Sequence, residues 1–527
     1  NSREKIDPKL TWPMALKSLR GSDVKPYWEA SRFDWVPRLA SDALRGNTRA
    51  LDNLNCWVDD WIKKNPPFMG INWSCGQETS LRVVNLAMAQ LILNKKIVPS
   101  RTLKWFLEVS YDRIHSTFHY AIGQDNNHGV SESCAIFIIG CWGKVLNLPN
   151  AYRLQHFGRK WLEDRAQKII QPDGSPAQYS TNYHRLNLEL FCIAELFRSY
   201  SGEKEFSEKF IKRICLGASW LFHITNPKNG FAPNLGANDG SNLFNFRKSQ
   251  YCDYRETVSL CARIFDSANA YHTDVFIDER AEDLHLPKAK KKWSYQKFKT
   301  YHNGGFHVAQ LSENLVVLRY ANFKFRPSQA DILHIDLWIR GQNILRDSGT
   351  FTYEANSVWS AYFKGTSSHN TIQFDDREQM PSISKFLFGD WIKTDYIKPI
   401  SEKNSALHFG AGYTDKKAAS HRRDVVFKEN KLIIHDRVSG FRHHAVLRWR
   451  FQPGSIKINE KSNKEFELRI KGKEKLKMNI SSTIPFSAVE VSKGWESKFY
   501  LLKTELPVLE IKITKPGVIK SELIWSS

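Results

Sequence analysis

The sequence predicts a two-part chain, in which a helical N-terminal half precedes an antiparallel β-rich C-terminal half. With 527 residues, the chain is longer than one hydrophobic core usually organises. Apolar residues recur at helical spacing over residues 27–285 and at a spacing of two after that. A lysine-rich linker, residues 286–299, separates the two patterns. We therefore predict a helical domain over residues 1–287 and a β domain over residues 288–527.

The helical half consists of amphipathic segments that are bounded by capping and breaking residues. Residues 81–91 and 186–200 carry apolar side chains three and four positions apart. Ser100 precedes another such segment as a cap, and Gly and Pro near residues 144–149 predict a helix end. Such helices, joined by loops rich in Asn, Gly and Pro, predict helical hairpins arranged as an incomplete barrel. Arrays of this kind commonly close into an (α/α) toroid around a cleft.

The C-terminal half contains short segments with the alternation of β-strands. Residues 314–320, 334–340, 431–435 and 446–451 show it clearly. Residues 341–343, Gly-Gln-Asn, predict a hairpin turn after the second of these segments. Similar short segments continue to the end of the chain, which predicts an antiparallel β-sandwich.

Charge and composition restrict the class of partner. The formal net charge of +22 predicts a polyanionic partner or an anionic surface. The basic residues are spread along the chain, and no zinc-finger, homeodomain or RNA-binding motif accompanies them, so nucleic acid is not the expected partner. A content of 41% hydrophobic residues excludes a disordered protein. An acidic polysaccharide is the partner that fits best, and the 17 Trp and 18 Tyr include residues suited to sugar stacking.

The eight cysteines all fall in the first half of the chain, in apolar helical contexts without zinc-ligand spacing. We expect buried free thiols, which are typical of a reducing compartment. The sequence shows no signal peptide and no membrane span. Two locations stay open: the bacterial periplasm or exterior, if a leader has been removed, and the cytoplasm. The oligomeric state is not predicted.

Two polar motifs carry the chemistry. Asn126-Asn127-His128 precedes the apolar run 134–140, so it is expected at a helix start, where backbone N–H groups favour an anion. Tyr183 follows a polar loop and begins another helix. Taken alone, Asn127 fits a helix cap beside an incidental His128, and Tyr183 fits ordinary packing. Taken together, an amide, an imidazole and a phenol are the groups that remove a proton next to a carboxylate.

Five short blocks occur in an order that resembles the heparinase II/III-like polysaccharide lyases. The blocks are residues 71–82 (Ile-Asn-Trp to Arg), 126–128, 173–184 (Asp-Gly-Ser to Tyr-His), 346–350 (Arg-Asp-Ser-Gly-Thr) and 364–371 (Lys-Gly-Thr-Ser-Ser-His-Asn-Thr). The family pairs an α/α toroid with a C-terminal antiparallel β-sandwich. The resemblance implies that Asn127 and His128 hold the substrate carboxylate. It also implies that Tyr183 donates the proton and often acts as the base.

The β half departs from the pattern of that family. A His-Ala-Asp motif is usual where this chain has Gln329-Ala330-Asp331, with a further His where this chain has Pro327. The resemblance implies a structural zinc held by the first of these histidines together with Asp347 and His369. Gln329 is a poor replacement, because amides are weak zinc ligands. The elimination itself requires no cofactor.

The missing histidines leave Tyr183 as the predicted base and acid. Tyr353, Tyr362 and His334 are alternative sources of the missing group, although His334 also fits a strand-edge hydrogen bond. His184 and Arg185 are neighbours that could lower the pKa of Tyr183. The residues predicted to contact substrate are Trp73, Glu78, Arg82, Gln124, Asn126, His184, Arg185, Arg326 and Gln329.

We therefore expect a lyase that cleaves a uronate-containing polysaccharide by β-elimination. Two other functions stay open. A glycoside hydrolase on the same toroid would need a facing pair of carboxylates, for which Asp125, Glu132 and Asp173 are available without a marked pairing. A non-catalytic glycan-binding protein is suggested by the altered zinc motif. The sequence does not name the polymer.

Overall fold

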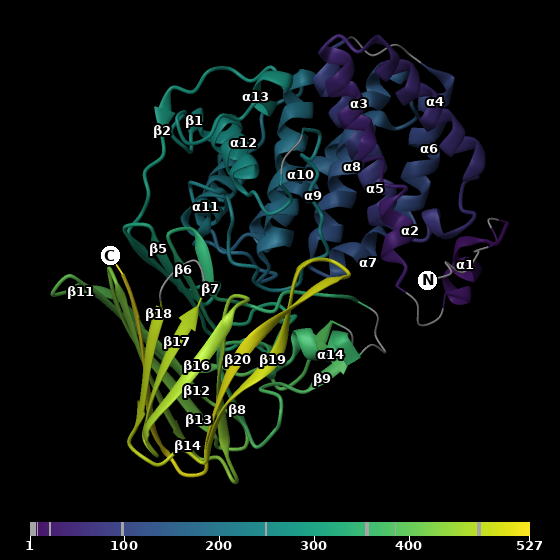
Figure 1. Ribbon diagram of the computed structural model, residues 1–527. Helices are drawn as coiled ribbons and strands as arrows, with labels where there is room; N and C mark the ends of the chain where they lie inside the picture. The colour runs from purple at the N-terminus through teal and green to yellow at the C-terminus, as the bar shows by residue number, and fades with distance from the viewer. Residues whose placement is uncertain are drawn as a thin grey trace. The chain divides into compact units, whose positions relative to one another are not determined.

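The computed structural model describes residues 7, 9–19, 23–95, 100–247, 250–353, 358–384, 386–471 and 476–526. They group into two compact units (Figure 1). The helical unit comprises Asn1–Gly174, Tyr183–Phe222 and Ser241–Ser294, and the β unit comprises Ser175–Asn182, His223–Gly240 and Tyr295–Ser527. The last boundary between the two units follows residue 294, whereas the sequence predicted a boundary after residue 287. Two segments of the N-terminal half, residues 175–182 and 223–240, belong to the β unit.

The N-terminal half is helical, as the spacing predicted. Its helices are α1 (Trp12–Ser18), α2 (Lys25–Glu29), α3 (Trp35–Leu44), α4 (Thr48–Lys64), η1 (Ile71–Trp73), α5 (Gly76–Leu93), α6 (Arg101–His115), α7 (Phe118–Gly123), α8 (Asn127–Leu146), α9 (Ala151–Ile169), α10 (Thr181–Tyr200), α11 (Glu208–Ile224), α12 (Arg255–Asp266) and α13 (Arg280–Asp283). The predicted segments 81–91 and 186–200 lie inside α5 and α10. The predicted cap is also confirmed, because Ser100 Oγ accepts a hydrogen bond from Leu103 N–H at 3.4 Å.

α8 is the core helix of this half. Within the described ranges, it is the one helix long and apolar enough to cross a membrane, and 89% of its apolar window is buried inside the protein. Such burial is typical of a helix that is surrounded by other helices. Its apolar length therefore follows from its central position in the helical unit.

α8 and α9 pack backbone against backbone through two glycines. A Cβ added to Gly140 of α8 would lie 2.2 Å from the backbone nitrogen of Gln155, and one added to Gly158 of α9 would lie 2.3 Å from that of Phe137. The two contacts run in opposite directions along the helices, so the pair is antiparallel. Glycine at both positions is what permits this close approach.

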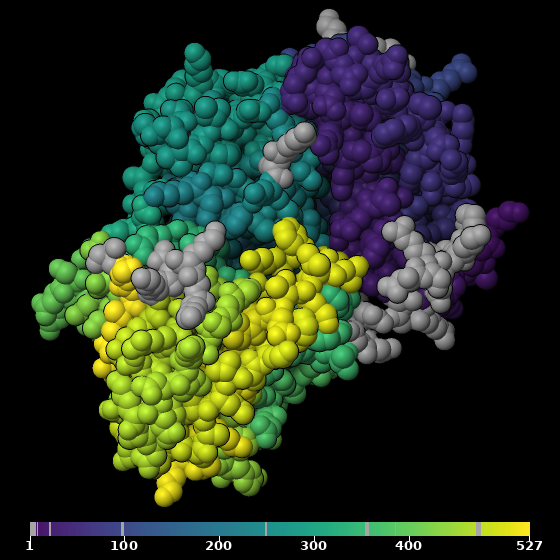
Figure 2. Space-filling view, in the orientation of Figure 1, coloured from purple at the N-terminus to yellow at the C-terminus, as the bar shows by residue number. Residues whose placement is uncertain are grey.

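Among the described residues, the C-terminal half contains three large antiparallel sheets and one small two-stranded antiparallel sheet. Its elements are β3 (Phe298–Tyr301), β4 (Phe306–Leu311), β5 (Asn314–Arg319), β6 (Ile335–Ile339), β7 (Gln342–Leu345), α14 (Val358–Lys364), η2 (Thr366–Ser368), β8 (Ile372–Phe374), β9 (Ser382–Ser384), β10 (Leu387–Phe388), β11 (Thr394–Lys403), β12 (Ala406–Thr414), β13 (Ser420–Lys428), β14 (Lys431–Ser439), β15 (Ala445–Arg450), β16 (Ser455–Ser462), β17 (Glu465–Lys471), β18 (Leu476–Ser482), β19 (Ala488–Phe499), β20 (Leu502–Ile513) and β21 (Gly517–Trp525). The sheet orders are β3-β4-β5-β6-β7, β19-β20-β15-β8 and β11-β12-β13-β14-β21-β18-β17-β16. Figure 2 shows β19 and β20, in yellow, on the surface of this unit.

The predicted strands correspond to β5, β6, β14 and β15. The hairpin turn after β6 is placed one residue earlier than expected. Arg340 and Gly341 take the left-handed conformation, with φ of 47° and 79°, and Gln342 already belongs to β7. A tight turn with two positive φ values matches the twist of the paired strands.

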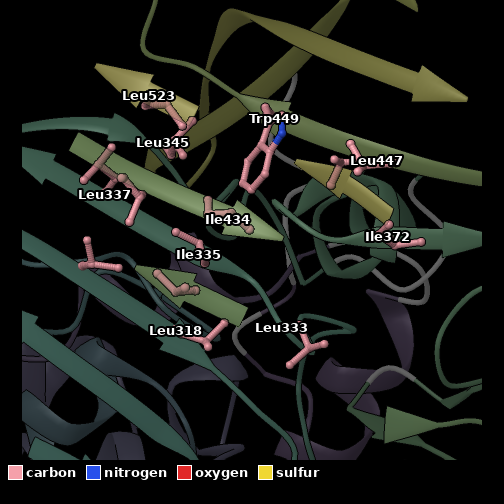
Figure 3. Packing of buried hydrophobic residues seen from close by; sticks show 14 of the residues in the cluster. Leu318, Leu333, Ile335, Leu337, Leu345, Ile372, Ile434, Leu447, Trp449 and Leu523 are labelled. Atoms are coloured by element: carbon pink, nitrogen blue, oxygen red, sulfur yellow. The ribbon is translucent and has the colours of Figure 1, made fainter. Parts of the chain in front are cut away.

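One hydrophobic cluster joins the three sheets of the β unit. Figure 3 shows Leu447 and Trp449 of β15 among leucines and isoleucines from β5, β6, β7, β8, β14 and β21. β13 alternates strictly between buried and half-buried residues, whereas every residue of β6 is buried. β6 is therefore covered on both faces, which places the loops at its ends next to the core.

The prediction of buried free thiols is confirmed in part, and the predicted linker contains a short strand. All eight cysteines, which the structure describes, are free thiols, but only Cys134, Cys141, Cys192 and Cys261 are buried. Within the predicted linker, residues 291–292 form β2, which pairs in parallel with β1 (Ala268–Asn269).

Replacing Gly140 with Ala should lower the free energy of unfolding by about 2–3 kcal/mol, because the added methyl group collides with backbone that cannot rotate away. Gly123→Ala is the matched control, since a Cβ at Gly123 meets no described atom within 4 Å. It should change stability by less than about 1 kcal/mol. Urea unfolding of both variants tests the contact, and equal effects would contradict it.

Candidate active site

The start of α8 is fixed by Asn126. Its backbone is extended, and its Oδ1 accepts a hydrogen bond from His128 N–H at 3.0 Å. Its Nδ2 donates to Gln124 Oε1 at 2.9 Å. The cap is therefore Asn126, which corrects the alternative that assigned capping to Asn127. Asn127 stands at the first helical position, and its side chain does not cap the helix.

Gln77 holds the amide of Asn127. Nδ2 of Asn127 donates to Gln77 Oε1 at 2.7 Å, and each residue is 4% exposed. Ser131 Oγ, one turn later on α8, also donates to Gln77 Oε1, at 3.4 Å. Two donors thus meet one acceptor at the start of α5. Gln77 was not among the residues predicted from the sequence. The only feature that could have indicated its role is its position in the block of residues 71–82, which carries the family resemblance.

The packing of α8 on α10 sets the position of Tyr183. Cys134 Sγ of α8 contacts the carbonyl oxygen of Leu190 of α10, 56 positions later in the chain, at 3.5 Å. The rings of Trp142 and Phe197, 55 positions apart, lie 5.1 Å from each other. The sequence separation of the two contacting pairs is nearly the same, 56 and 55 positions, so α8 and α10 run parallel and in register. Tyr183 follows Asn127 by the same 56 positions, so both stand two turns before the contact at Cys134.

The structure therefore brings the two predicted motifs to one end of the helical unit. Asn127 and Tyr183 occupy matching levels of adjacent helices, and Gln77 adds the start of α5. His128 and Tyr183 are half-buried, which leaves part of each side chain accessible. The N-terminal ends of α5, α8 and α10 together favour a negative group at this place.

Glu132 lies one turn after His128 and is 2% exposed. Its Oε2 has no hydrogen-bond partner among the described residues. Burial raises the pKa of Glu132 well above its ordinary value, and the nearby His128 partly opposes that increase. A Cβ at Gly76 would lie 2.6 Å from Glu132 Oε1, so the glycine at the start of α5 makes room for this carboxyl group. The sequence had considered Glu132 only as a hydrolase carboxylate.

Three predicted substrate contacts form an internal network instead. Glu78 accepts hydrogen bonds from Arg32 at 2.6 and 2.7 Å. The guanidinium of Arg82 lies over the rings of Trp61 and Trp73, and burial lowers its pKa to about 10. Glu78, Arg82 and Trp73 are at most 1% exposed. Their burial and their internal partners support a structural role for these three residues.

His184 and Arg185 anchor α10. His184 Nε2 lies 2.9 Å from Gly217 O, and burial lowers the pKa of this imidazole to about 4. Arg185 donates to the carbonyl oxygens of Ser241 at 2.9 Å and Tyr251 at 2.6 Å. His184 is thus uncharged near neutral pH, and Arg185 is enclosed. Neither arrangement supports the predicted effect on the pKa of Tyr183.

Three candidates of the β unit differ in burial, because Gln329 is buried whereas Arg326 and Tyr353 are half-buried. Gln329 and Tyr353 line a cavity of about 30 Å³ together with Thr350 and Lys364. The backbone N–H of Tyr353 donates to Tyr500 Oη at 2.7 Å. Arg326 is half-buried, with its guanidinium over the ring of Phe325. The predicted roles of Arg326 and Tyr353 stay predictions. The predicted substrate contact of Gln124, in the helical unit, also stays a prediction.

His334, Asp347 and His369 form a buried group. Asp347 Oδ2 lies 3.4 Å from His369 Nε2 and 3.8 Å from His334 Nε2. His334 is fully enclosed, and burial lowers its pKa to about 3. The geometry therefore gives no support to His334 as a catalytic residue. The described residues contain no cluster of three or more His, Cys, Asp or Glu side chains able to hold a metal.

Two family models match most of the chain. The model described as "Heparinase II/III N-terminus" matches residues 12–260, and "Heparinase II/III-like, C-terminal" matches residues 296–515. Over 449 residues the chain is 23% identical to a heparin-sulfate lyase from Pedobacter heparinus, which covers 81% of this chain and 61% of that protein. Over 503 residues the chain is 22% identical to a heparin-sulfate lyase from Bacteroides stercoris. That alignment covers 86% of this chain and 67% of the Bacteroides protein.

A solved structure shares the fold. The crystal structure of heparinase III matches with a TM-score of 0.67 at 14% identity, covering 92% of this chain and 75% of that one. This likeness confirms the predicted order of a helical region and an antiparallel β-rich region, while closure into a toroid stays a prediction. The chain spans 61% of the length of the Pedobacter relative.

Glu132→Gln should stabilise the protein increasingly as pH rises. An unfolded Glu loses its proton near its ordinary pKa of ~4.3, whereas burial holds the proton on folded Glu132 to higher pH. Between those two values, stability falls with rising pH because the unfolded state binds fewer protons. The glutamine does not titrate, so the difference in melting temperature should grow as the pH rises above about 4.

Thermal melts of wild type and Glu132→Gln across this pH range provide the test. The exposed Glu205→Gln serves as the control for removal of one carboxylate. A difference between wild type and Glu132→Gln that is constant with pH would contradict the buried, protonated state.

Proposed function

The chain belongs to the heparinase II/III-like family, and from this premise we propose that it is a polysaccharide lyase that cleaves an acidic, uronate-containing polysaccharide by β-elimination. The observation that carries the proposal is the parallel register of α8 and α10. It places Asn127, His128 and Tyr183 at one end of the helical unit. Amide, imidazole and phenol are thereby available to one bound sugar.

The proposed reaction needs a stabilised carboxylate and one proton carrier. Asn127 and His128 donate hydrogen bonds to the uronate carboxylate, where negative charge develops as the C5 proton leaves. A donor of this kind contributes typically ~3–4 kcal/mol to the transition state. Tyr183 takes the C5 proton and returns a proton to the departing O4. The C5–H and C4–O bonds break, and a C4–C5 double bond forms.

The tyrosine must lose its proton for this reaction, although an ordinary phenol has a pKa near ~10. His184 and Arg185 are buried and engaged, so they do not supply the positive environment. The clustered N-terminal ends of α5, α8 and α10 do supply positive potential. We propose that this potential, together with His128, favours the phenolate of Tyr183.

The substrate class follows from charge and relatives. The net charge of +22 favours a polyanion, and two similar proteins are named heparin-sulfate lyases. We therefore propose a glycosaminoglycan as the substrate class. The hydrolase alternative has less support, because Asp125 pairs with Arg165 at the surface while Glu132 is buried. A lyase product absorbs ultraviolet light through its double bond, whereas a hydrolase product does not.

Tyr183→Phe should abolish formation of unsaturated product, because phenylalanine can neither take nor return a proton. General acid–base groups contribute about 10²–10⁴-fold, so at least that loss in kcat is expected. Tyr200→Phe removes a hydroxyl from the opposite end of the same helix and should retain activity. Ultraviolet absorbance measures the product on a panel of acidic polysaccharides, and a fully active Tyr183→Phe enzyme would refute the mechanism.

Asn127→Ala should lower kcat by about 10²–10³-fold with a smaller change in KM, since its amide acts on charge that develops during reaction. Gln77 acts through Asn127, so Gln77→Ala should cause a smaller loss. The double variant should be no slower than Asn127→Ala alone. Multiplying losses would show that Gln77 acts independently, and an effect on KM alone would count against the role of Asn127.

A further inference from the structure

A row of positively charged side chains crosses the outer face of the eight-stranded sheet of the β unit. Figure 1 shows strands of this sheet, whose order is β11-β12-β13-β14-β21-β18-β17-β16. Each strand contributes one residue close to one of its ends, and in strand order these are Lys403, Ala406, Lys428, Lys431, Ile524, Lys477, Arg469 and Lys457. Six of these eight described residues carry a positive charge, and none is acidic. We call this line of residues the cation row.

The strand register establishes one half of the cation row. Lys457 of β16 is opposite Arg469 of β17, and Arg469 is opposite Lys477 of β18. Lys477 is opposite Ile524 of β21, which in turn is opposite Lys431 of β14. Side chains that are directly opposite on neighbouring strands lie on the same face of the sheet. Lys457, Arg469 and Lys477 are exposed, so this face is turned to solvent.

The other half continues the cation row across β14, β13, β12 and β11. Lys431 is opposite Lys428, and Lys403 is opposite Ala406. The register between β12 and β13 brings Ala406 beside Lys428. Adjacent strands lie about 4.8 Å apart, so the eight positions span about 34 Å. The cation row is therefore long enough to contact several consecutive units of an extended polymer.

The cation row breaks a general rule of β-sheets. Like charges that are directly opposite on neighbouring strands destabilise a sheet. The row contains three such pairs, which are Lys457 with Arg469, Arg469 with Lys477, and Lys428 with Lys431. Residues that break a local rule of stability are expected at functional sites. An anion bound along the row would remove the repulsion.

Glu467 of β17 lies beside the cation row and is shared by three cations. Its Oε2 lies 3.1 Å from Lys477 Nζ and 3.2 Å from Lys461 Nζ, and its Oε1 lies 3.3 Å from Arg469 Nε. Hydrogen bonds from Lys477, Lys461 and Arg469 lower the pKa of Glu467 to about 2. One carboxylate thus serves three cations, and the surroundings stay positive.

Two further carboxylates lie near the cation row. Glu522 of β21 is 3.1 Å from Lys431 and 4.0 Å from Lys520. Glu429 lies in the turn between β13 and β14, where it accepts a hydrogen bond from Ser312 Oγ at 2.7 Å. Lys461 and Lys520 add to the charge of the row itself. The positive charge therefore exceeds the negative charge along this end of the sheet.

We propose that the cation row is a docking site for a linear acidic polysaccharide, whose sulfate or carboxylate groups lie along its six cations. An extended chain with a charge on each sugar ring fits a line of single cations that stand one or two strands apart. The row offers no aromatic side chain on which the bases of a single-stranded nucleic acid would stack. The polymer class rests on the proposed function, whereas the site itself holds the polymer without reacting with it.

The test measures binding of fluorescein-labelled heparin fragments to the purified full chain. The Tyr183→Phe background keeps the probe intact. The variant Lys457→Gln/Arg469→Gln/Lys477→Gln should weaken binding of a long fragment about tenfold near physiological salt, because three exposed ion contacts are lost. The slope of log Kd against log salt concentration should fall by about 2, since fewer counterions are released.

The matched control removes the same charge outside the cation row. It is Lys393→Gln/Lys416→Gln/Lys493→Gln, in which all three lysines are exposed. Lys393 precedes β11 and Lys416 follows β12, at the opposite end of the sheet, and Lys493 belongs to β19 of another sheet. Salt screens such separated charges, so the control should change Kd less than about twofold.

A second variant tests the other half of the cation row and replaces the first if the first fails to fold. Lys403→Gln/Lys428→Gln/Lys431→Gln should also weaken binding of a long fragment. A tetrasaccharide reaches only one half of a row of about 34 Å. Each half-row variant should therefore affect the tetrasaccharide less than the long fragment.

Two results would overturn the proposal. One is equal binding by both half-row variants and the control, and the other is binding of duplex DNA as tight as that of heparin at the same salt concentration. Row-dependent binding by a chain that forms no unsaturated product would count against the proposed function and still support the docking site.

Discussion

The register between α8 and α10 is the constraint on which the candidate active site depends. Most of α8 is buried, and Gly140 and Gly158 allow its backbone to pack directly against the backbone of α9. Cys134 and Trp142 of α8 contact Leu190 and Phe197 of α10, and these contacts fix the register of the two helices. A slip of one turn would displace Tyr183 by about 5.4 Å along the axis. The core of the helical unit therefore determines whether amide, imidazole and phenol can meet one sugar.

Burial decides which polar residues can act on a substrate. Glu78, Arg82 and Arg185 have chemistry suited to a polyanion, but each is enclosed and occupied by internal partners. Asn127 is also buried, yet it stands at a helix start where backbone N–H groups are unpaired within the helix. Glu78 also stands in the first turn of a helix, so its pairing with Arg32, and not its position alone, removes it from the candidates.

The sequence predicted the helices, the principal strands and both polar motifs, because these have local signatures. Partners that are distant in sequence have none. Arg32, which neutralises Glu78, lies 46 positions away, and nothing in either segment marks the pair. Gln77 was missed for the same reason, since a glutamine on a helix has no distinctive spacing. The choice of Asn126 over Asn127 as cap needed backbone geometry, because either residue caps well.

The two replaced histidines of the β unit have different consequences. Where the family resemblance implies a further histidine base, this chain has Pro327, and the alternative candidate His334 is enclosed, with a pKa that burial lowers to about 3. We therefore propose that proton transfer falls to Tyr183 of the helical unit. The Gln329 replacement lies in the β unit, where its Nε2 donates to Gly349 O at 3.1 Å and the N–H of Gly349 donates to Asp347 Oδ1 at 2.7 Å. This position is thus held by hydrogen bonds within the β unit and supplies no group to the proposed proton transfer.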